Sequence, residues 1–368
     1  SDGSYRLVVN YAQLNKKIVF DSFPLPTIEN TFQQLNGAKI FSIIDLQQAF
    51  FQIPLTERSR KYTAFCTPFG LYQFKSVPMG LSIGSQALSR ILDDIFQDLK
   101  AQFLITYCDD LLIYSKNMSE HLSHLNIVLE RLAKSGFTIN PKKVILATTK
   151  IKFLGHILTP RGIQVNPDRT EAIQTYPRPK NLRAVRRFLG MTGFYSRFIP
   201  NYATIAAPLN YLKKKNIIFK WKIEQKNAFQ KLKQALITAP TLKMPDFSRP
   251  FVLQCDASNN SIAVVLNQRM DEGIAPIAYA SKLLNSTQQN YPMYEKEIMS
   301  IVFGCEKFRT HLDHLHFTIQ SDCQVATWLL RKIDLRGKMG RWIMKLSSYK
   351  IEIEHISGTQ NPVADALT

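Results

Sequence analysis

FLITYCDDLLIYS, residues 103–115, is the stretch that decides the fold of the first part of this chain. Two strongly apolar runs flank Asp109 and Asp110, and this pattern predicts two β-strands joined by a tight hairpin. Another apolar run, KIFSIIDL (39–46), predicts a strand with Asp45 at its end. Carboxylates beside an apolar core cost free energy unless they are paired or bind a metal. The three aspartates therefore indicate either a metal site or an ordinary hairpin turn, in which Asp is common.

A metal site made of carboxylates would point to phosphoryl transfer. Mg²⁺ prefers carboxylate oxygens together with substrate phosphates. Two such ions, about 3.5–4 Å apart, can stabilise both the attacking and the leaving oxygen. The hairpin by itself leaves this hypothesis and the turn hypothesis open.

The charge of the chain favours a polyanionic partner. Among 368 residues, 47 Lys and Arg stand against 28 Asp and Glu, a net charge of +19. Between Arg161 and Pro240 there are 16 basic residues and 3 acids. Nucleic acid is the first candidate, and a solvated basic face is the simpler alternative. No apolar stretch reaches 18 residues, so we expect no membrane span, and a start at Ser1 suggests a piece of a longer polypeptide.

Three zones differ in their patterns. Residues 1–162 mix short strands with helices, residues 163–245 are basic and mostly helical, and residues 246–368 alternate strands and helices as an α/β domain does. KFLGHIL (152–158) predicts one short strand, and the proline-rich segment 238–250 predicts a linker.

The helix predicted after Asn117 begins with a capping box and ends near Gly136. Its apolar face is expected to consist of Leu122, Leu125, Leu129 and Leu132. The histidines are expected at surface polar positions: His121, His124, His311, His314 and His316. The cysteines predict reduced, core-type thiols of an intracellular protein rather than a disulfide frame or a zinc site, because none forms a C-x-x-C pair and several lie in apolar runs: Cys66, Cys108, Cys255, Cys305 and Cys323.

YCDD (107–110) resembles the Tyr-x-Asp-Asp signature of reverse transcriptases. Further blocks follow in the order of that family: DGSYRLVVNYAQLNK (2–16), KYTAFCTPFGLYQF (61–74), INPKKV (139–144), KFLGHIL (152–158) and FLGMTGFYSRFIPNYATIAAPL (188–209). They look most like the gypsy class of LTR retrotransposons and related endogenous retroviruses, and they cover essentially the whole chain. The resemblance implies an α+β right-hand polymerase followed by an α/β ribonuclease H-like domain. Fingers and palm would span 1–162, the thumb and linking region 163–245, and the ribonuclease H domain 246–368.

The resemblance also implies roles for matching residues. Asp45, Asp109 and Asp110 would hold two Mg²⁺ ions, for which Mn²⁺ can substitute. Phe50 would exclude a nucleotide 2′-OH, and Arg6 would grip the triphosphate, a task that suits a guanidinium. The expected nucleotide and template pocket includes Met79, Gln86 and Tyr107, and the expected primer grip is Phe153, Leu154 and Gly155.

Two blocks depart from the family pattern. Asn10, Tyr11 and Ala12 replace the usual Asp-Tyr-Arg, and MGLSIGS (79–85) replaces Phe-Gly-Leu-x-Asn-Ala-Pro. These differences touch the walls of the pocket rather than the carboxylates. They motivate an alternative hypothesis, in which the chain is a non-catalytic nucleic-acid-binding subunit or a domesticated relic.

A second set of acids resembles the Asp-Glu-Asp-Asp cluster of ribonuclease H: Asp256, Glu297, Asp322 and Asp365. Each alone could be an exposed acid. The blocks that carry them are CDASNNSIAVVLNQ (255–268), YEKEIMSIV (294–302), FTIQSDCQVATWLL (317–330) and HISGTQNPVADAL (355–367). The cluster implies two Mg²⁺ ions with water as the nucleophile. His355 is expected to shuttle or release protons, or else to hydrogen-bond locally at a strand end.

The expected enzyme is thus an RNA- and DNA-directed DNA polymerase with RNA–DNA hybrid ribonuclease H activity. The expected partners are an RNA template, a DNA primer, an RNA–DNA hybrid and deoxynucleoside triphosphates. A homodimer is compatible with the sequence. The expected location is intracellular, in the cytoplasm or within virus-like particles.

Overall fold

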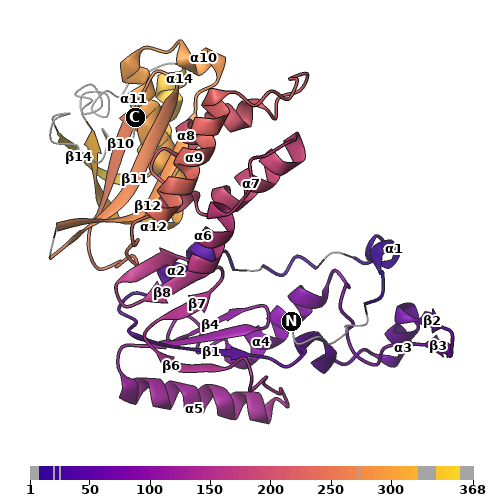
Figure 1. The fold of residues 1–368 in the computed structure, drawn as a ribbon. Helices are drawn as coiled ribbons and strands as arrows, with labels where there is room; N and C mark the ends of the chain where they lie inside the picture. The colour runs from indigo at the N-terminus through magenta and orange to yellow at the C-terminus, as the bar shows by residue number, and fades with distance from the viewer. Residues whose placement is uncertain (1–7, 20, 25, 272, 322–336, 357–368) are drawn as a thin grey trace. The chain divides into compact units, whose positions relative to one another are not determined.

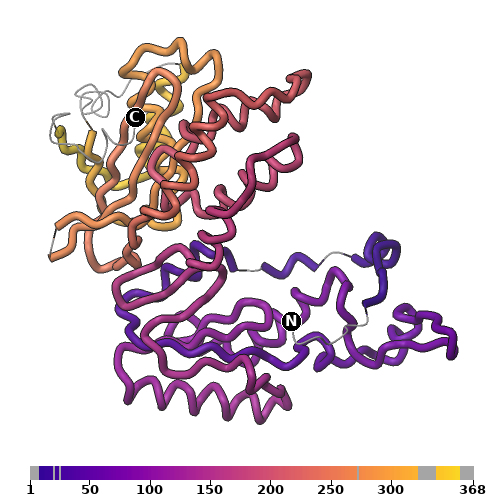
Figure 2. The backbone as a smooth tube through the Cα atoms, in the orientation of Figure 1, coloured from indigo at the N-terminus to yellow at the C-terminus, as the bar shows by residue number. Residues whose placement is uncertain are grey.

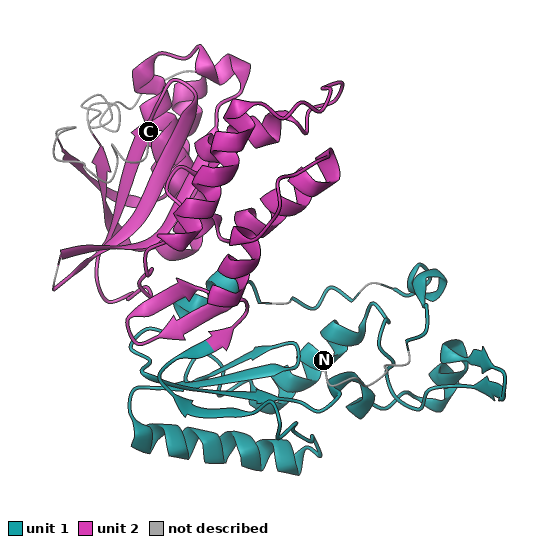
Figure 3. Ribbon diagram, in the orientation of Figure 1, with its two compact units in different colours: residues 1–151 teal, residues 152–368 magenta. Residues whose placement is uncertain are grey.

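The computed structural model describes residues 8–19, 21–24, 26–271, 273–321 and 337–356 (Figure 1). Three residues of the expected sites lie outside the described residues: Arg6, Asp322 and Asp365. The chain divides into two compact units, residues 1–151 and residues 152–368 (Figure 3). Each unit is described by itself.

Unit 1 is built on a four-stranded sheet with the order β4-β5-β1-β6, and a separate hairpin joins β2 to β3. The strands are β1 (Ile40–Asp45), β2 (Phe65–Thr67), β3 (Gly70–Tyr72), β4 (Leu104–Tyr107), β5 (Asp110–Ser115) and β6 (Ile145–Thr148). The helices are α1 (Ala12–Asn15), α2 (Ile28–Gln33), η1 (Ala49–Gln52), α3 (Glu57–Arg60), η2 (Lys61–Thr63), α4 (Gly84–Phe96) and α5 (Met118–Lys134).

One face of this sheet forms the core of unit 1 with two helices. Ile44 of β1 and Ile113 of β5 cluster with Leu92 of α4 and Val128 of α5, and all four are fully buried. Since successive side chains of a strand point to opposite faces, Asp45 points to the other face. The face of the sheet that the helices cover thus forms the core, and the opposite face carries Asp45.

The predicted helix after Asn117 is confirmed, and its predicted apolar face is correct for Leu125 and Leu132 but wrong for Leu122 and Leu129. The Asn117 side chain caps α5 by accepting a hydrogen bond from the Glu120 N–H. The buried face consists of His121, Leu125, Val128 and Leu132, while Leu122 and Leu129 are exposed.

His121 is fully buried, so its prediction as a surface residue was wrong. Its ring nitrogens lie 2.7 Å from Ser42 Oγ and 2.8 Å from Ser115 Oγ, which satisfies both polar atoms of the imidazole. Burial lowers the pKa of His121, and His124 lowers it further. His311 is also buried, against the same prediction, whereas His314 and His316 are exposed as expected.

Unit 2 contains a five-stranded sheet with the order β12-β11-β10-β13-β14 and a three-stranded sheet, β7-β8-β9. Its strands are β7 (Ile151–Phe153), β8 (His156–Thr159), β9 (Gly162–Val165), β10 (Phe251–Ala257), β11 (Ser261–Met270), β12 (Gly273–Leu283), β13 (His316–Ser321) and β14 (Lys350–His355). Its helices are α6 (Pro167–Gln174), α7 (Leu182–Phe194), η3 (Ser196–Phe198), α8 (Tyr202–Tyr211), α9 (Ile223–Ile237), α10 (Ser286–Gln289), α11 (Met293–Lys307), α12 (Arg309–Leu312) and α14 (Gly337–Leu346). Figure 2 follows the same path as a tube.

The large sheet of unit 2 is mixed. β10, β11 and β12 are antiparallel, and β13 and β14 continue the sheet in parallel from β10. Helix α11 packs against β10 and β11, and its Ile301 and Cys305 are buried in one core with Leu253 and Val264. Strand–helix–strand connections of this kind give the α/β character predicted for the last zone.

Two local predictions for unit 2 were wrong. Residues 152–158 form the hairpin that the family resemblance implied rather than the single strand that the apolar pattern predicted, because Leu154 and Gly155 both have positive φ, 46° and 76°. The segment 238–250 is not a loose linker, since Leu242 is fully buried and exchanges backbone hydrogen bonds with Ile163, at 2.7 and 2.9 Å.

Among the glycines of unit 2 that the structure describes, Gly162 leaves the least room for a side chain. It has a φ of 136°, and a Cβ there would lie 2.1 Å from the Leu242 carbonyl oxygen. Gly162→Ala is therefore expected to lower the free energy of unfolding by roughly 3 kcal/mol or more, because backbone strain and the clash add. Urea denaturation measures this loss.

Gly190, inside α7, provides the matched control, since a Cβ there would meet nothing within 4 Å. Gly190→Ala is expected to raise the free energy of unfolding by about 0.5–1 kcal/mol, as Gly→Ala does within a helix. Equal effects of the two substitutions would contradict this account of Gly162.

Candidate active sites

The first candidate site is where β1 meets the β4–β5 hairpin. Asp45 and Asp110 are directly opposite each other in the antiparallel β1–β5 register, so their side chains emerge on the same face. Tyr107 pairs with Asp110 across the hairpin, which leaves Cys108 and Asp109 as a two-residue loop. Cys108 has a φ of 52°, and the Asp109 carbonyl accepts a hydrogen bond from the Leu46 N–H at 3.2 Å. The loop is thus tied to the strand end that carries Asp45.

The electrostatics of this site favour a bound cation. The pKa of Asp110 is raised to about 6, first by burial and then by the negative charges of Asp109 and Asp45. Lys143 partly offsets this rise. The charges of Asp109 and Asp45 thus disfavour the ionised form of Asp110, and the three carboxylates are a donor set suited to Mg²⁺.

The ligand geometry is not preformed. Within the described ranges, no group of three or more His, Cys, Asp or Glu side chains is arranged to hold a metal ion. Instead, the Lys143 ammonium lies 3.2 and 3.0 Å from the two carboxylate oxygens of Asp45, which is itself 7% exposed. The carboxylate donors suit Mg²⁺, but one of them, Asp45, forms an ion pair with Lys143.

Sequence reasoning missed Lys143 as part of this site. The only available signal was its place in INPKKV (139–144), since 98 residues separate it from Asp45. The ammonium supplies a positive charge where two carboxylates face each other.

Lys143→Met is expected to destabilise the metal-free chain at pH 7 by roughly 0.5–1 kcal/mol, a modest value because the lysine is largely exposed. Added Mg²⁺ should recover more stability in the variant than in the wild type, since the Lys143 ammonium no longer competes with the ion for the Asp45 carboxylate. Urea denaturation with EDTA or with Mg²⁺ measures both effects. The exposed neighbour Lys142, replaced in the same way, is the control. An equal loss in Lys142→Met would show that Lys143 has no specific role.

The residues expected around the nucleotide lie close to the start of α4. The half-buried Phe50, in η1, packs against Gly84, where a Cβ would be 3.4 Å from its ring. The side-chain oxygen of Gln86 is buried and accepts no hydrogen bond within the part of the chain that the structure describes. Such an acceptor is costly unless a ligand or water satisfies it. Met79 is half-buried in the loop that precedes α4.

Asn15 is a second residue that sequence reasoning missed. Its side-chain amide donates to the Gly80 carbonyl at 2.8 Å, and its side-chain oxygen accepts from the Ser82 N–H at 2.9 Å. It therefore fixes the loop whose sequence departs from the family pattern. Gly80 itself has a φ of 98°, a conformation that favours glycine.

The expected primer-grip residues form the turn between β7 and β8. A Cβ at Gly155 would lie 3.2 Å from the Phe194 ring, and the Tyr195 hydroxyl donates to the Gly155 carbonyl at 2.5 Å. Phe153 is buried. The hairpin is thus anchored on the end of α7, and its tight approach requires glycine.

The second candidate site is in the large sheet of unit 2. Asp256 lies in β10, and Glu297, which is 5% exposed, lies on α11, the helix packed against that strand. The pKa of the Cys255 thiol is raised mainly by burial, then by Cys305, Glu297 and Asp256. Both carboxylates are thus close to Cys255. His355 is exposed at the end of β14 and pairs with Ser321, the last residue of β13.

Two family models match the chain. Residues 1–158 match the model described as reverse transcriptase (RNA-dependent DNA polymerase), and residues 221–319 match the RNase H-like domain found in reverse transcriptase. The Pol polyprotein from transposon 297 of Drosophila melanogaster is 38% identical over 365 residues, 99% of this chain and 34% of the relative. That from transposon gypsy of the same fly is 33% identical over 376 residues, 99% of this chain and 36% of the relative. The chain thus spans about a third of the length of these relatives.

Solved structures share the fold. The foamy viral protease-reverse transcriptase in complex with double-stranded DNA has a TM-score of 0.87 at 24% identity, over 97% of this chain and 63% of that one. The same enzyme in complex with RNA/DNA hybrid has a TM-score of 0.81 at 23% identity, over 97% and 49%.

The fold and the matches define a reverse transcriptase domain followed by a ribonuclease H-like domain, which confirms the predicted fold class. Over nearly its whole length, the chain is similar to the reverse transcriptase and ribonuclease H region of the Pol polyproteins of gypsy-class LTR retrotransposons. In the described part of the chain, no helix has the length and apolar character needed to cross a membrane.

Proposed function

We propose that the chain copies RNA and DNA templates into DNA and cleaves the RNA of RNA–DNA hybrids. The observation that carries the polymerase proposal is the β1–β5 register, which sets Asp45 opposite Asp110 beside the Asp109 loop. The proposed domains are fingers and palm over 1–162, the thumb and linking region over 163–245, and ribonuclease H over 246–368.

Asp45, Asp109 and Asp110 would hold the Mg²⁺ ions of the polymerase site. When bound, two such ions stabilise the attacking and leaving oxygens of phosphoryl transfer. The remaining work of the chain is positioning. Phe50 would present its ring to the 2′ position of the sugar, and Gln86 would offer its buried oxygen as a hydrogen-bond acceptor to the nucleotide or template.

The ribonuclease H proposal rests on Asp256 and Glu297. Together with Asp322 and Asp365, they would hold two further Mg²⁺ ions. His355 would move protons from a strand end that is open to solvent.

Arg6 would grip the triphosphate in the first site.

The proposed partners follow from the same chemistry. RNA template, DNA primer and their hybrid are polyanions, which suits a net charge of +19, and deoxynucleoside triphosphates supply the monomers. The proposed partners include a second copy of the chain, and light scattering would show whether a homodimer forms. The proposed location is the cytoplasm or virus-like particles.

The test of the polymerase proposal is extension of a DNA primer on an RNA template. Extension should require Mg²⁺ or Mn²⁺ and all four deoxynucleotides, and the full-length product should resist RNase. A chain that binds the hybrid tightly but never extends the primer would favour the alternative of a non-catalytic binding subunit. The observation behind that alternative is the pairing of Asp45 with Lys143 in place of a preformed ligand cluster.

A further inference from the structure

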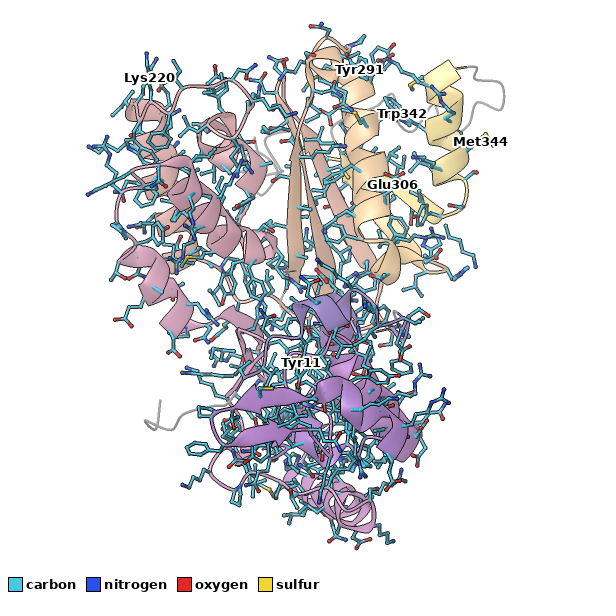
Figure 4. The ribbon with its side chains drawn as sticks, turned by 90° about the vertical axis from the view of Figure 1, so that its right-hand side faces the viewer. Tyr11, Lys220, Tyr291, Glu306, Trp342 and Met344 are labelled. Atoms are coloured by element: carbon cyan, nitrogen blue, oxygen red, sulfur yellow. The ribbon has the colours of Figure 1, made fainter. Side chains whose placement is uncertain are left out.

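The helical hairpin of α8 and α9 carries an unusual density of positive charge. From Tyr202 to Ile237, eight lysines accompany a single acid, Glu224. The connection between the helices, YLKKKNIIFKWK (211–222), holds five of these lysines, and all five are exposed. Lys220 lies at the end of the hairpin that is far from the strands (Figure 4).

In the part of the chain that the structure describes, the lysines of this connection lack acidic partners, although the Lys214 ammonium lies 5.3 Å from the centroid of the Tyr211 ring. Within the described residues, none of lysines 213, 214, 215, 220 and 222 forms an ion pair with an acid. Lys233 on α9 behaves differently, since its ammonium donates to the carbonyls of Gln174 and Tyr176 at 2.7 Å each. Lys233 thus has a structural role in this helix pair, whereas the lysines of the connection form no ion pair within the described residues.

An aromatic hollow of about 430 Å³ lies on one side of this basic connection. Trp221, Ile223 and Phe229 line it together with Arg178 and Lys226. The Arg178 guanidinium lies 5.8 Å from the centroid of the Trp221 ring, so a planar cation already rests near this ring.

A second hollow, of about 570 Å³, lies on the other side. Tyr211, Ile217 and Ile218 line it together with Lys220. Tyr211 is 50% exposed and Ile218 is 76% exposed, so apolar and aromatic faces are open to solvent. Lys222 lines both hollows, which makes them neighbours on one surface.

Basic and aromatic groups in this alternation fit single-stranded nucleic acid. A duplex presents phosphates but hides the faces of its bases, whereas an unpaired strand offers both. Lysines that have no acidic partner suit phosphates, and hollows of this size suit planar ring systems. Charge complementarity therefore selects a polyanion, and the aromatic walls select one whose bases are unstacked.

We propose that this α8–α9 surface, residues 211–230 with Arg178, binds a single-stranded stretch of nucleic acid. Phosphates would lie on the lysines, and bases would lie against Trp221 and Tyr211. The inference rests on the proposed function, because a copying enzyme must handle unpaired template, but it concerns residues that belong to neither set of carboxylates.

The test measures binding in EDTA, so that it does not depend on catalysis. The probe is a labelled oligothymidine of about 16 nucleotides, a typical site size for such grooves. Replacing lysines 213, 214 and 215 by Gln in the full chain should weaken its binding about tenfold or more and reduce the log–log salt slope by about 2. Binding of a blunt RNA–DNA hybrid of the same length should fall less than oligothymidine binding, because a duplex offers phosphates but no base faces to this surface.

Two further variants separate the surface from general charge and from folding. Replacing Lys307, Lys345 and Lys350 by Gln removes the same charge from exposed positions of unit 2 and should leave oligothymidine binding nearly unchanged. Trp221→Phe retains an aromatic ring, and it should remove most of the quenching of tryptophan fluorescence that the bound oligonucleotide causes in the wild type.

Three outcomes would overturn the proposal. They are an equal loss of hybrid binding, an equal loss in the control variant, and unchanged oligothymidine binding in the 213–215 variant. Competition by polyglutamate as effective as that by oligothymidine would instead identify a surface for an acidic protein. If primer extension fails while oligothymidine still binds here, the polymerase proposal falls and this one stands.

Discussion

Asp110→Asn is expected to abolish primer extension and, at the same time, to make the metal-free chain more stable. Activity should fall roughly a thousandfold or more, because several kcal/mol of charge stabilisation depends on the carboxylates that would hold the metal. Stability should rise because the substitution removes a carboxylate that faces Asp45 across the β1–β5 register and adjoins Asp109. A substitution that merely damaged the fold would lower both quantities.

The gain in stability has a defined size and pH dependence. The pKa of Asp110 rises from 3.8 to about 6 on folding. That shift corresponds to about 3 kcal/mol, which solvent screening of the partly exposed carboxyl reduces to roughly 1–2 kcal/mol. Since the folded state holds its proton more tightly, this group supports folding below pH 4, and its support is lost as the pH rises through 6. The variant's advantage in EDTA should therefore grow between pH 4 and pH 7.

Urea denaturation in EDTA across this pH range measures the stability, and extension on an RNA template measures the activity. Asp94→Asn is the matched control, because Asp94 is an exposed acid of the same unit. It should leave both quantities nearly unchanged. Wild-type extension by Asp110→Asn would remove Asp110 from the site.

Glu297→Gln is expected to abolish RNA cleavage while leaving primer extension intact. Glu297 is buried on α11, and its carboxylate lies near Cys255, as does that of Asp256. Loss of one buried carboxylate should reduce hybrid cleavage roughly a thousandfold, because it would remove a ligand of the metal. Primer extension should change little, since the polymerase carboxylates belong to another sheet.

The pair of variants forms a two-way comparison. Asp110→Asn should retain hybrid cleavage, just as Glu297→Gln should retain extension. Glu306→Gln on the same helix controls for a general effect on α11, because Glu306 is exposed and pairs with Lys345 at 2.5 Å. Loss of both activities in either variant would mean that the two carboxylate sets do not work independently.

Local sequence patterns predicted much of the fold correctly. Apolar runs of four to eight residues gave β1, β4, β5 and β10 nearly at their observed bounds, because strand formation there depends on burial that the pattern already encodes. The Asn117 cap likewise predicted where α5 begins, since capping is a contact between near neighbours. Residue type also identified the carboxylates as candidate metal ligands, because few other side chains can hold Mg²⁺.

Errors arose where a distant contact reversed a local preference. His121 faces the core of unit 1 because Ser42, 79 residues away, and Ser115 satisfy its ring nitrogens. Leu154 takes a positive φ, which a leucine rarely adopts, and so turns a predicted strand into a hairpin. The residues beside His121 and Leu154 in the sequence do not predict the burial of His121 or the positive φ of Leu154.

Residue type and local pattern therefore identified the candidates for the proposed chemistry: three aspartates beside apolar strands and a second set of acids that resembles ribonuclease H. Which residues come together depends on the tertiary structure. The β1–β5 register sets Asp45 against Asp110, and the loop after residue 138 brings Lys143 to Asp45 across 98 residues. The physical reason is that residue type sets what a side chain can bind, whereas charge repulsion and pairing depend on distance, which arises only when strands far apart in the chain are brought together.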